Sequence, residues 1–193
     1  MAALSVNHSL SSPLRWLLPW AVLAWLLAGG AALAQPASQR ESAVKAAFLF
    51  KFPAFVEWPA GSFRTPDHPV VIGVLGNDAV ASDLEQLAAS RHLDGRPVTV
   101  RRLAEGEPPA GVHLLFVGAT TPARLRESVA AAAGPVLVVA EQEGGLRAGA
   151  VLNFTQEEGR VRFGASLAAA EARGLRLSSR LLAVASAVEG RTR

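Results

Sequence analysis

The stretch VVIGVLGND, Val70 to Asp78, is a short and almost wholly apolar run that passes directly into turn-forming residues. Such a run is typical of a parallel strand covered on both faces. Two further runs, Val112–Val117 and Val136–Ala140, have the same character. Because helical segments stand between these runs, the pattern predicts an α/β fold, with a mostly parallel sheet and helices on both sides.

The segments around these runs complete the predicted domain. Apolar residues at three- and four-residue spacing predict a helix from Glu41, which Pro53 interrupts. Ala150–Thr155 and Arg160–Leu167 flank a Glu-Glu-Gly turn, so we expect a C-terminal β-hairpin. Further helices are expected at residues 79–90, 121–133, 167–173 and, with Ser178 as its cap, 178–188, and a further strand at 97–103.

The N-terminus indicates export. Arg15 precedes an apolar run, Trp16 to Leu33, and Ala-Leu-Ala then stands directly before Gln35. This order predicts a signal peptide, residues 1–34, that is cleaved on export to the periplasm. An uncleaved anchor helix is the alternative, since a run of about 18 residues is near the lower limit for a membrane span. We expect residues 35–40 to be a disordered leader and residues 41–190 to form a single domain.

Charge and cysteine content exclude several classes of protein. The chain has 19 Lys and Arg against 16 Asp and Glu, but no basic run with interleaved aromatic residues. A nucleic-acid groove is therefore not expected. The sequence contains no cysteine, which excludes disulfides, thiolate metal sites and cysteine nucleophiles.

The sequence contains no recognisable catalytic or cofactor motif. His68, His92 and His113 have no partners at a catalytic spacing, and neither GxSxG nor HExxH is present. His113 opens a strand, where a hydrogen-bonded core residue is the expected role. Gly73–Asp78 is neither GxGxxG nor a P-loop. We therefore expect no enzyme activity, no metal and no cofactor; a weak small-molecule site in the crevice beside Asn77 is the alternative.

A dense group of aromatic residues lies near the start of the expected domain. A helix that covers a sheet buries one face, so most of the group should belong to the core. One face cannot hold all of them, and Phe55, Glu57 and Trp58 are the candidates for a partner interface. Glu57 is expected to be a solvated or capping acid; a buried pair with an arginine is the alternative. The aromatic residues are Phe48, Phe50, Phe52, Phe55 and Trp58.

The C-terminal block LRLSSRLLAVA, Leu175 to Ala185, allows two interpretations. In one, Ser178 caps an amphipathic helix whose leucines are buried. In the other, hydroxyl and guanidinium groups form a rim that binds a carboxylate or phosphate. The candidate ligand-binding residues, which we expect to share one crevice, are Asn77, Arg176, Ser178, Ser179 and Arg180.

Seven segments, in order and with matching spacing from about Glu41 to Glu189, resemble the YfiR-like family of small periplasmic proteins. One departure is Phe163-Gly164-Ala165-Ser166, where relatives often have Phe-Glu-Ile-Asn, so a contact made by that acid and amide is in doubt here. The segments are FVEWP (55–59), IGVLGND (72–78), LDGRPVTVRRL (93–103), HLLFVGAT (113–120), GGLRAGAVLNF (144–154), VRF (161–163) and LRLSSRLLAVA (175–185).

The resemblance implies a three-layer α/β/α sandwich in the periplasm that is not an enzyme. It also implies a repressor that binds the periplasmic domain of an inner-membrane diguanylate cyclase, and thereby controls cyclic di-GMP and biofilm formation. An outer-membrane lipoprotein would draw the repressor away, and the family's members are expected to form homodimers and to bind small ligands. Two alternatives remain: a regulator of a sensor histidine kinase, and a periplasmic small-molecule-binding protein.

Overall fold

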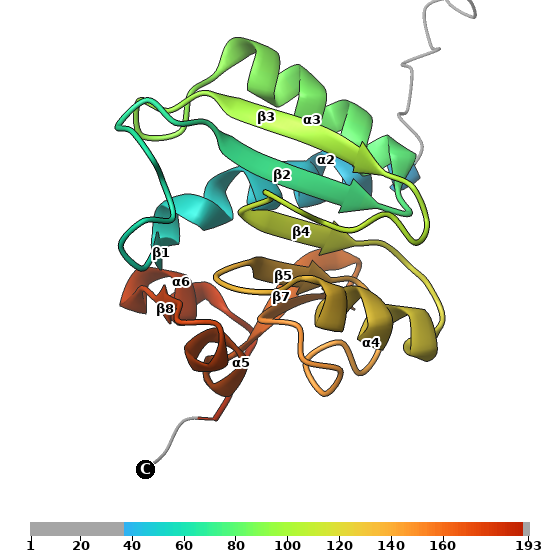
Figure 1. The fold of residues 1–193 in the computed structure, drawn as a ribbon. Helices are drawn as coiled ribbons and strands as arrows, with labels where there is room; N and C mark the ends of the chain where they lie inside the picture. Colours follow the sequence, from blue (N-terminus) through green and yellow to red (C-terminus); the bar gives the residue numbers. More distant parts are fainter. Residues whose placement is uncertain (1–36, 191–193) are drawn as a thin grey trace, which may run out of the picture. The chain divides into compact units, whose positions relative to one another are not determined.

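The computed structural model describes residues 37–190 (Figure 1), so the expected signal peptide lies outside the described residues. Seven strands form the main sheet, in the spatial order β3-β2-β4-β5-β6-β7-β9. Their bounds are β2 Val70–Leu75, β3 Val98–Leu103, β4 Leu114–Val117, β5 Leu137–Ala140, β6 Leu152–Glu157, β7 Arg160–Ser166 and β9 Ala187–Glu189.

The pairing of these strands confirms the predicted sheet. The strands from β3 to β6 are parallel to their neighbours, and β6 and β7 form the expected antiparallel hairpin. Alternate residues of the three central strands, β2, β4 and β5, pack against different cores, as Leu114 and Leu115 do on the two faces of β4. Both faces are therefore buried, which explains why these strands are apolar throughout.

Helices cover both faces and make the three-layer sandwich. On one face, α2 (Ala37–Lys51) packs beside α3 (Asp78–Ser90) over the larger core. On the other face, α4 (Pro122–Ala131) buries Leu125 and Val129 in the smaller core. Two short helices, α5 (Leu167–Ala172) and α6 (Ser179–Val184), lie where the parallel strands begin (Figure 1).

The N-terminal part of the domain departs from expectation in two places. Helix α2 begins at Ala37, so residues 37–40 are its first turn and not part of a disordered leader. Pro53 interrupts the helix, as predicted, and lies in the 3₁₀ turn η2 (Phe52–Phe55); the strand β1 (Val56–Glu57) that follows was not expected. Phe50 and Phe52 are buried, while Phe48, Phe55 and Trp58 are partly buried against the core.

The C-terminal helix is shorter than predicted. It ends at Val184, and β9 then pairs in parallel with β7, with Gly164 opposite Ala187. Ser186 also donates its backbone N–H to the carbonyl of Phe163. The outer edge of β7 would otherwise present unpaired backbone groups, so this pairing outweighs the local preference for helix. None of the described helices has the length and apolar character needed to cross a membrane.

Candidate functional site

The two blocks singled out at opposite ends of the sequence meet in a two-stranded sheet. Strand β1 pairs antiparallel with β8 (Arg176–Leu177), which places Val56 opposite Leu177 and Glu57 opposite Arg176. We name the surrounding region the β1–β8 surface. Its residues are Phe55, Glu57, Trp58, Arg176, Ser178, Ser179 and Arg180.

A charged pair lies in the middle of the β1–β8 surface. Nε of Arg176 is 3.4 Å from Oε2 of Glu57, and the two side chains are 81% and 67% exposed. Glu57 is therefore a solvated acid, as predicted; it pairs with an arginine at the surface, and the alternative of a buried pair does not form. Because both groups stay in water, the pair stabilises the fold little and remains accessible to a partner.

Trp58 directly follows Glu57 in the sequence, and its side chain is held from two directions. Its Nε1 donates to the carbonyl of Pro53 over 3.1 Å. Its ring packs edge-on against Phe63 and His113, with centroids 5.8 and 6.0 Å away. The indole is half-buried and fixed in orientation, which is the condition under which an aromatic side chain serves as an interface anchor.

His113 supports Trp58 from the core. The backbone N–H of Val71 donates to Nδ1 over 3.1 Å, so this nitrogen is unprotonated and Nε2 donates to the carbonyl of Ser62 at 3.0 Å. Burial lowers the pKa of His113, the hydrogen bond to Ser62 opposes this effect, and the neighbouring Arg96 and His68 lower the pKa further. His113 is therefore a hydrogen-bonded core residue, as predicted, and it ties the loop after Trp58 to the sheet.

Ser178 is the helix cap that the sequence indicates. Its Oγ accepts from the N–H of Leu181, and its own N–H donates to the carbonyl of Phe55. Helix α6 has only six residues, while Ser179 and Arg180 are exposed. The binding of an anion by Arg176, Ser178, Ser179 and Arg180 stays a prediction.

Asn77 lies at the other edge of the sheet, where β2 ends, and the β1–β8 surface lies where the parallel strands begin (Figure 1). The prediction that Asn77 shares one crevice with Arg176, Ser178, Ser179 and Arg180 is therefore wrong. Oδ1 of Asn77 caps α3 by accepting from the N–H of Val80, and Nδ2 donates to Oε1 of Glu141 over 3.0 Å. The amide is thus engaged with the protein itself.

Glu141 is the centre of a buried polar network that sequence reasoning missed. Its carboxylate accepts from Nζ of Lys45 at 2.7 Å, from the N–H of Ala119 at 2.8 Å and from Asn77. Burial lowers the pKa of Lys45, but its bonds to Glu141 and Glu41 outweigh that effect and raise it. The only sequence signal is that an acid directly follows the apolar run 136–140.

Asn153 lies beside this network and is itself buried. Its Nδ2 donates to the carbonyl of Phe154, whereas its Oδ1 has no partner among the described residues. A Cβ on Gly145 would lie 2.1 Å from this oxygen. Glycine is therefore required at position 145, because its backbone closes directly over the amide.

The departure from the family pattern falls on β7. Phe163 and Ala165 are fully buried, and Leu146 packs 3.2 Å from where a Cβ of Gly164 would be. Oγ of Ser166 caps α5 by accepting from the N–H of Ala169. This segment therefore packs in the core and caps α5, and it presents no acidic side chain.

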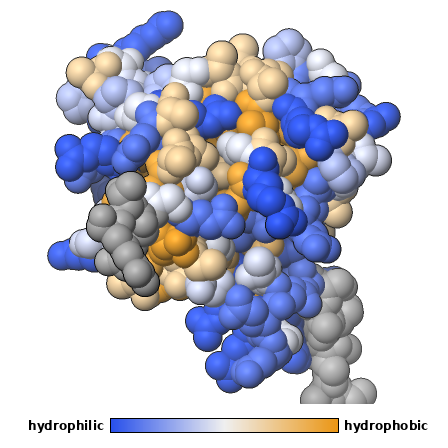
Figure 2. Space-filling model, turned by 90° about the horizontal axis from the view of Figure 1, so that it is seen from below, coloured by the Kyte–Doolittle hydropathy of each residue, from blue (hydrophilic) through white to orange (hydrophobic). Residues whose placement is uncertain are grey.

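The surface carries little apolar area outside these features. On the face shown in Figure 2, apolar residues form small patches separated by hydrophilic side chains. Val44 and Val184 are the large apolar residues that are exposed in the part of the chain described here. Within residues 37–190 no group of His, Asp and Glu side chains is arranged to hold a metal ion.

The chain belongs to the YfiR/HmsC-like family, whose profile matches residues 42–186. The match spans the whole sheet except the last strand, and membership indicates a regulatory protein of cyclic di-GMP signalling in the periplasm.

A conserved domain protein from Vibrio cholerae O1 biovar El Tor, known from a crystal structure, has 15% sequence identity and a TM-score of 0.47. The alignment covers 62% of this chain and 55% of that one, so the chain spans about half of that protein's length. None of the curated proteins compared with the chain is significantly similar to it.

Proposed function

We propose that this protein is a non-enzymatic periplasmic regulator that binds the periplasmic domain of an inner-membrane diguanylate cyclase and holds the cyclase inactive. Family membership supports the regulatory role and the link to cyclic di-GMP. The enzyme as partner, the direction of the effect and the docking surface are our inference.

One observation carries the choice of surface. The β1–β8 pairing places an exposed acid and an exposed base side by side, although Glu57 and Arg176 are far apart in the sequence, and the oriented indole of Trp58 directly follows Glu57 in the chain. Interfaces favour aromatic and arginine side chains as anchors, surrounded by polar groups. We therefore propose that Trp58 and Arg176 contact the partner and that Glu57 orients Arg176.

Repression requires a difference in affinity. A regulator shifts the equilibrium of a receptor only if it binds one state of the receptor more tightly than the other. The β1–β8 surface would therefore fit the inactive state of the cyclase better than the active one. A competitor for this surface, such as an outer-membrane lipoprotein, would release the cyclase and raise cytoplasmic cyclic di-GMP.

The test is cyclic di-GMP in a deletion strain, its parent and a complemented strain. A rise on deletion that complementation reverses supports the repressor. An unchanged level in all three strains would rule out a cyclase partner and leave a sensor kinase as the next candidate. A direct binding measurement with the purified periplasmic domain of the cyclase then identifies the partner.

A further inference from the structure

The order of the strands creates a crevice at the carboxyl ends of the parallel strands. Strands β3 and β4 follow each other in sequence, yet both are neighbours of β2, one on each side. The chain therefore reverses direction across the sheet at β2, with α3 on one face and α4 on the other. In open α/β sheets, the crevice outside the carboxyl ends of strands at such a reversal is the preferred place for a ligand.

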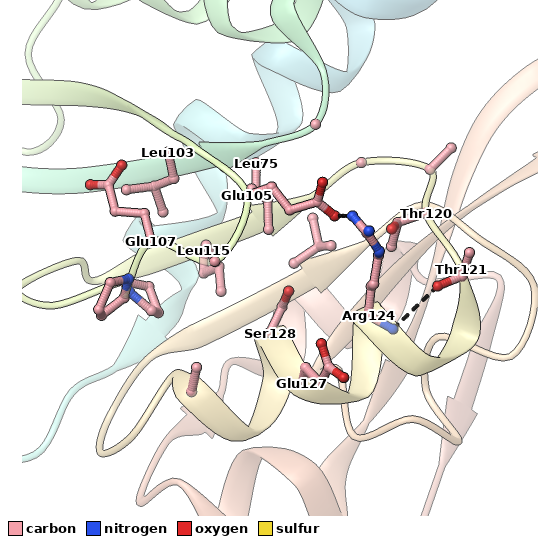
Figure 3. Close-up of a pocket in the computed structure, with 18 of the residues that line it drawn as sticks. Leu75, Leu103, Glu105, Glu107, Leu115, Thr120, Thr121, Arg124, Glu127 and Ser128 are labelled. Carbon is pink, nitrogen blue, oxygen red and sulfur yellow. Dashed lines mark hydrogen bonds and ion pairs between the residues drawn. The ribbon is translucent and has the colours of Figure 1, made fainter.

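A cleft of about 1080 Å³ occupies this position (Figure 3). One wall is the face of α4 that carries Arg124, Glu127, Ser128 and Ala131, and the opposite wall is the loop 105–109. The volume suits a small organic molecule. Its apolar floor is formed by Leu75, Leu103, Leu115 and Val117.

Two glycines keep the sheet edge of the cleft free of side chains. Gly76 ends β2 with a φ of 77°, a conformation that favours glycine. Gly118 ends β4, and a Cβ there would lie 2.6 Å from the carbonyl oxygen of Gly76. The two strand ends are therefore in backbone contact and leave the space beyond them to the cleft.

The charges of the lining are mostly negative. Asp78, Glu105, Glu107 and Glu127 line the cleft, against the single cation Arg124.

Three of these acids are ion-paired, and two of their partners lie outside the lining. Arg124 reaches across the cleft to Glu105 (Figure 3), Arg102 pairs with Asp78 and Arg101 with Glu107. Within residues 37–190, Glu127 is the lining carboxylate without an ion pair, and it stands next to Ser128. A cation is the charge that complements this carboxylate.

We propose that this cleft binds a small organic amine, with the ammonium group at Glu127 and an apolar body over Leu75 and Leu115. Anionic ligands such as nucleotides and carboxylates are disfavoured, because they would place negative charge among the acids of the rim. This site is separate from the β1–β8 surface, and the proposal does not depend on the function proposed above.

The experiment uses the exported protein, purified from the periplasm, and two probes that differ in charge. 2-Phenylethylamine and 3-phenylpropionate share a phenyl ring and a two-carbon chain, but end in an ammonium and a carboxylate respectively. Each is titrated while ¹H–¹⁵N spectra report the backbone amides. We expect the amine alone to shift the amides of Gly76, Gly118, Thr121 and Ser128 in a saturable way.

Two variants and a matched control locate the site. Glu127→Gln removes the charge, and we expect it to weaken binding of the amine about tenfold. Ala131→Phe fills the cleft and should abolish binding. Glu171→Gln, on an exposed residue of α5, is the control and should bind as the parent does. Equal binding of the carboxylate, shifts confined to the β1–β8 surface, no shifts, or equal effects of Glu127→Gln and Glu171→Gln would each overturn the proposal.

Discussion

Glu57 lies directly opposite Arg176 in the antiparallel pair of β1 and β8, with 3.4 Å between Oε2 of the carboxylate and Nε of the guanidinium. Both side chains are mostly exposed, and pairs of this kind contribute about 0–1 kcal/mol to stability. The pair therefore matters for what the surface presents, and it can be altered without harm to the fold.

We expect Glu57→Arg to release the cyclase while changing the free energy of unfolding by less than about 1 kcal/mol. In the proposed complex the new charge repels Arg176 and alters the surface that meets the partner. The measurement is cyclic di-GMP in the deletion strain complemented with the variant, together with urea unfolding of the purified protein. The control is Glu85→Arg on α3, which disrupts an exposed ion pair with Arg102 of β3 and should still repress. Full repression by Glu57→Arg would remove this surface from the proposal.

Loss of the Glu141 carboxylate should lower the free energy of unfolding substantially. Glu141→Ala leaves the buried Lys45 ammonium and the N–H of Ala119 without their acceptor, and we expect a loss of about 3 kcal/mol in the free energy of unfolding. Glu41→Ala removes the more exposed partner of the same lysine and should cost clearly less. Urea unfolding of both variants tests the order; equal losses would contradict a central role for Glu141.

Protonation of His113 should destabilise the fold at mildly acidic pH. Since burial holds the pKa of the folded state below 6.5, the unfolded state takes up the proton first. The stability that neutral His113 contributes is complete above pH 6.5 and is lost as the pH falls from there through the lower folded pKa.

His113→Gln removes this titration. The variant should therefore lose less stability than the parent between pH 7.5 and pH 5, as measured by urea unfolding at both values. Trp58 fluorescence reports the same region, because its ring packs on His113. Identical pH dependence in the two proteins would refute the assignment.

Gly118→Ala should destabilise the domain by about 1–3 kcal/mol, because its Cβ would force the Gly76 carbonyl to move. Gly73→Ala is the comparison and should cost less. There the new Cβ meets the ends of the Leu103 and Val112 side chains at 3.0 Å, and side chains move aside more easily than backbone does. Thermal unfolding ranks the two variants. A smaller loss at position 118 than at position 73 would show that the two strand ends are not tightly packed.

Prediction from sequence succeeded where local pattern and burial agree. The apolar runs at 70–75, 112–117 and 136–140 indicate strands covered on both faces, and the structure places them at the centre of the sheet. It failed at residues 185–188, where a helix was predicted but the need of β7 for a partner strand outweighs helix propensity. The start of α2 at Ala37 was also missed, because the first turn of the helix carries no apolar periodicity.

The sequence indicates individual residues of the candidate site, but it does not show which of them lie together. Phe55, Glu57, Trp58 and the 176–180 block stand out in the sequence, but no local rule says that β1 and β8 pair. Asn77 also stands out, yet its neighbours Glu141 and Lys45 come from distant parts of the chain. A single acid after a strand, such as Glu141, cannot be recognised from the sequence, because its hydrogen-bond donors are brought to it only by the fold.

By itself the sequence determined the class of the domain. Continuous apolar strands must be covered on both faces, and helices with an apolar face every 3.6 residues can cover them in only a few layered arrangements. Only the tertiary structure decided which strand ends and which short strands are neighbours. That choice depends on contacts between residues far apart in the chain, whose free energy exists only once the sheet has assembled. The Glu57–Arg176 pair, the Glu141 network and the cleft over Leu75 and Leu115 are all products of that assembly.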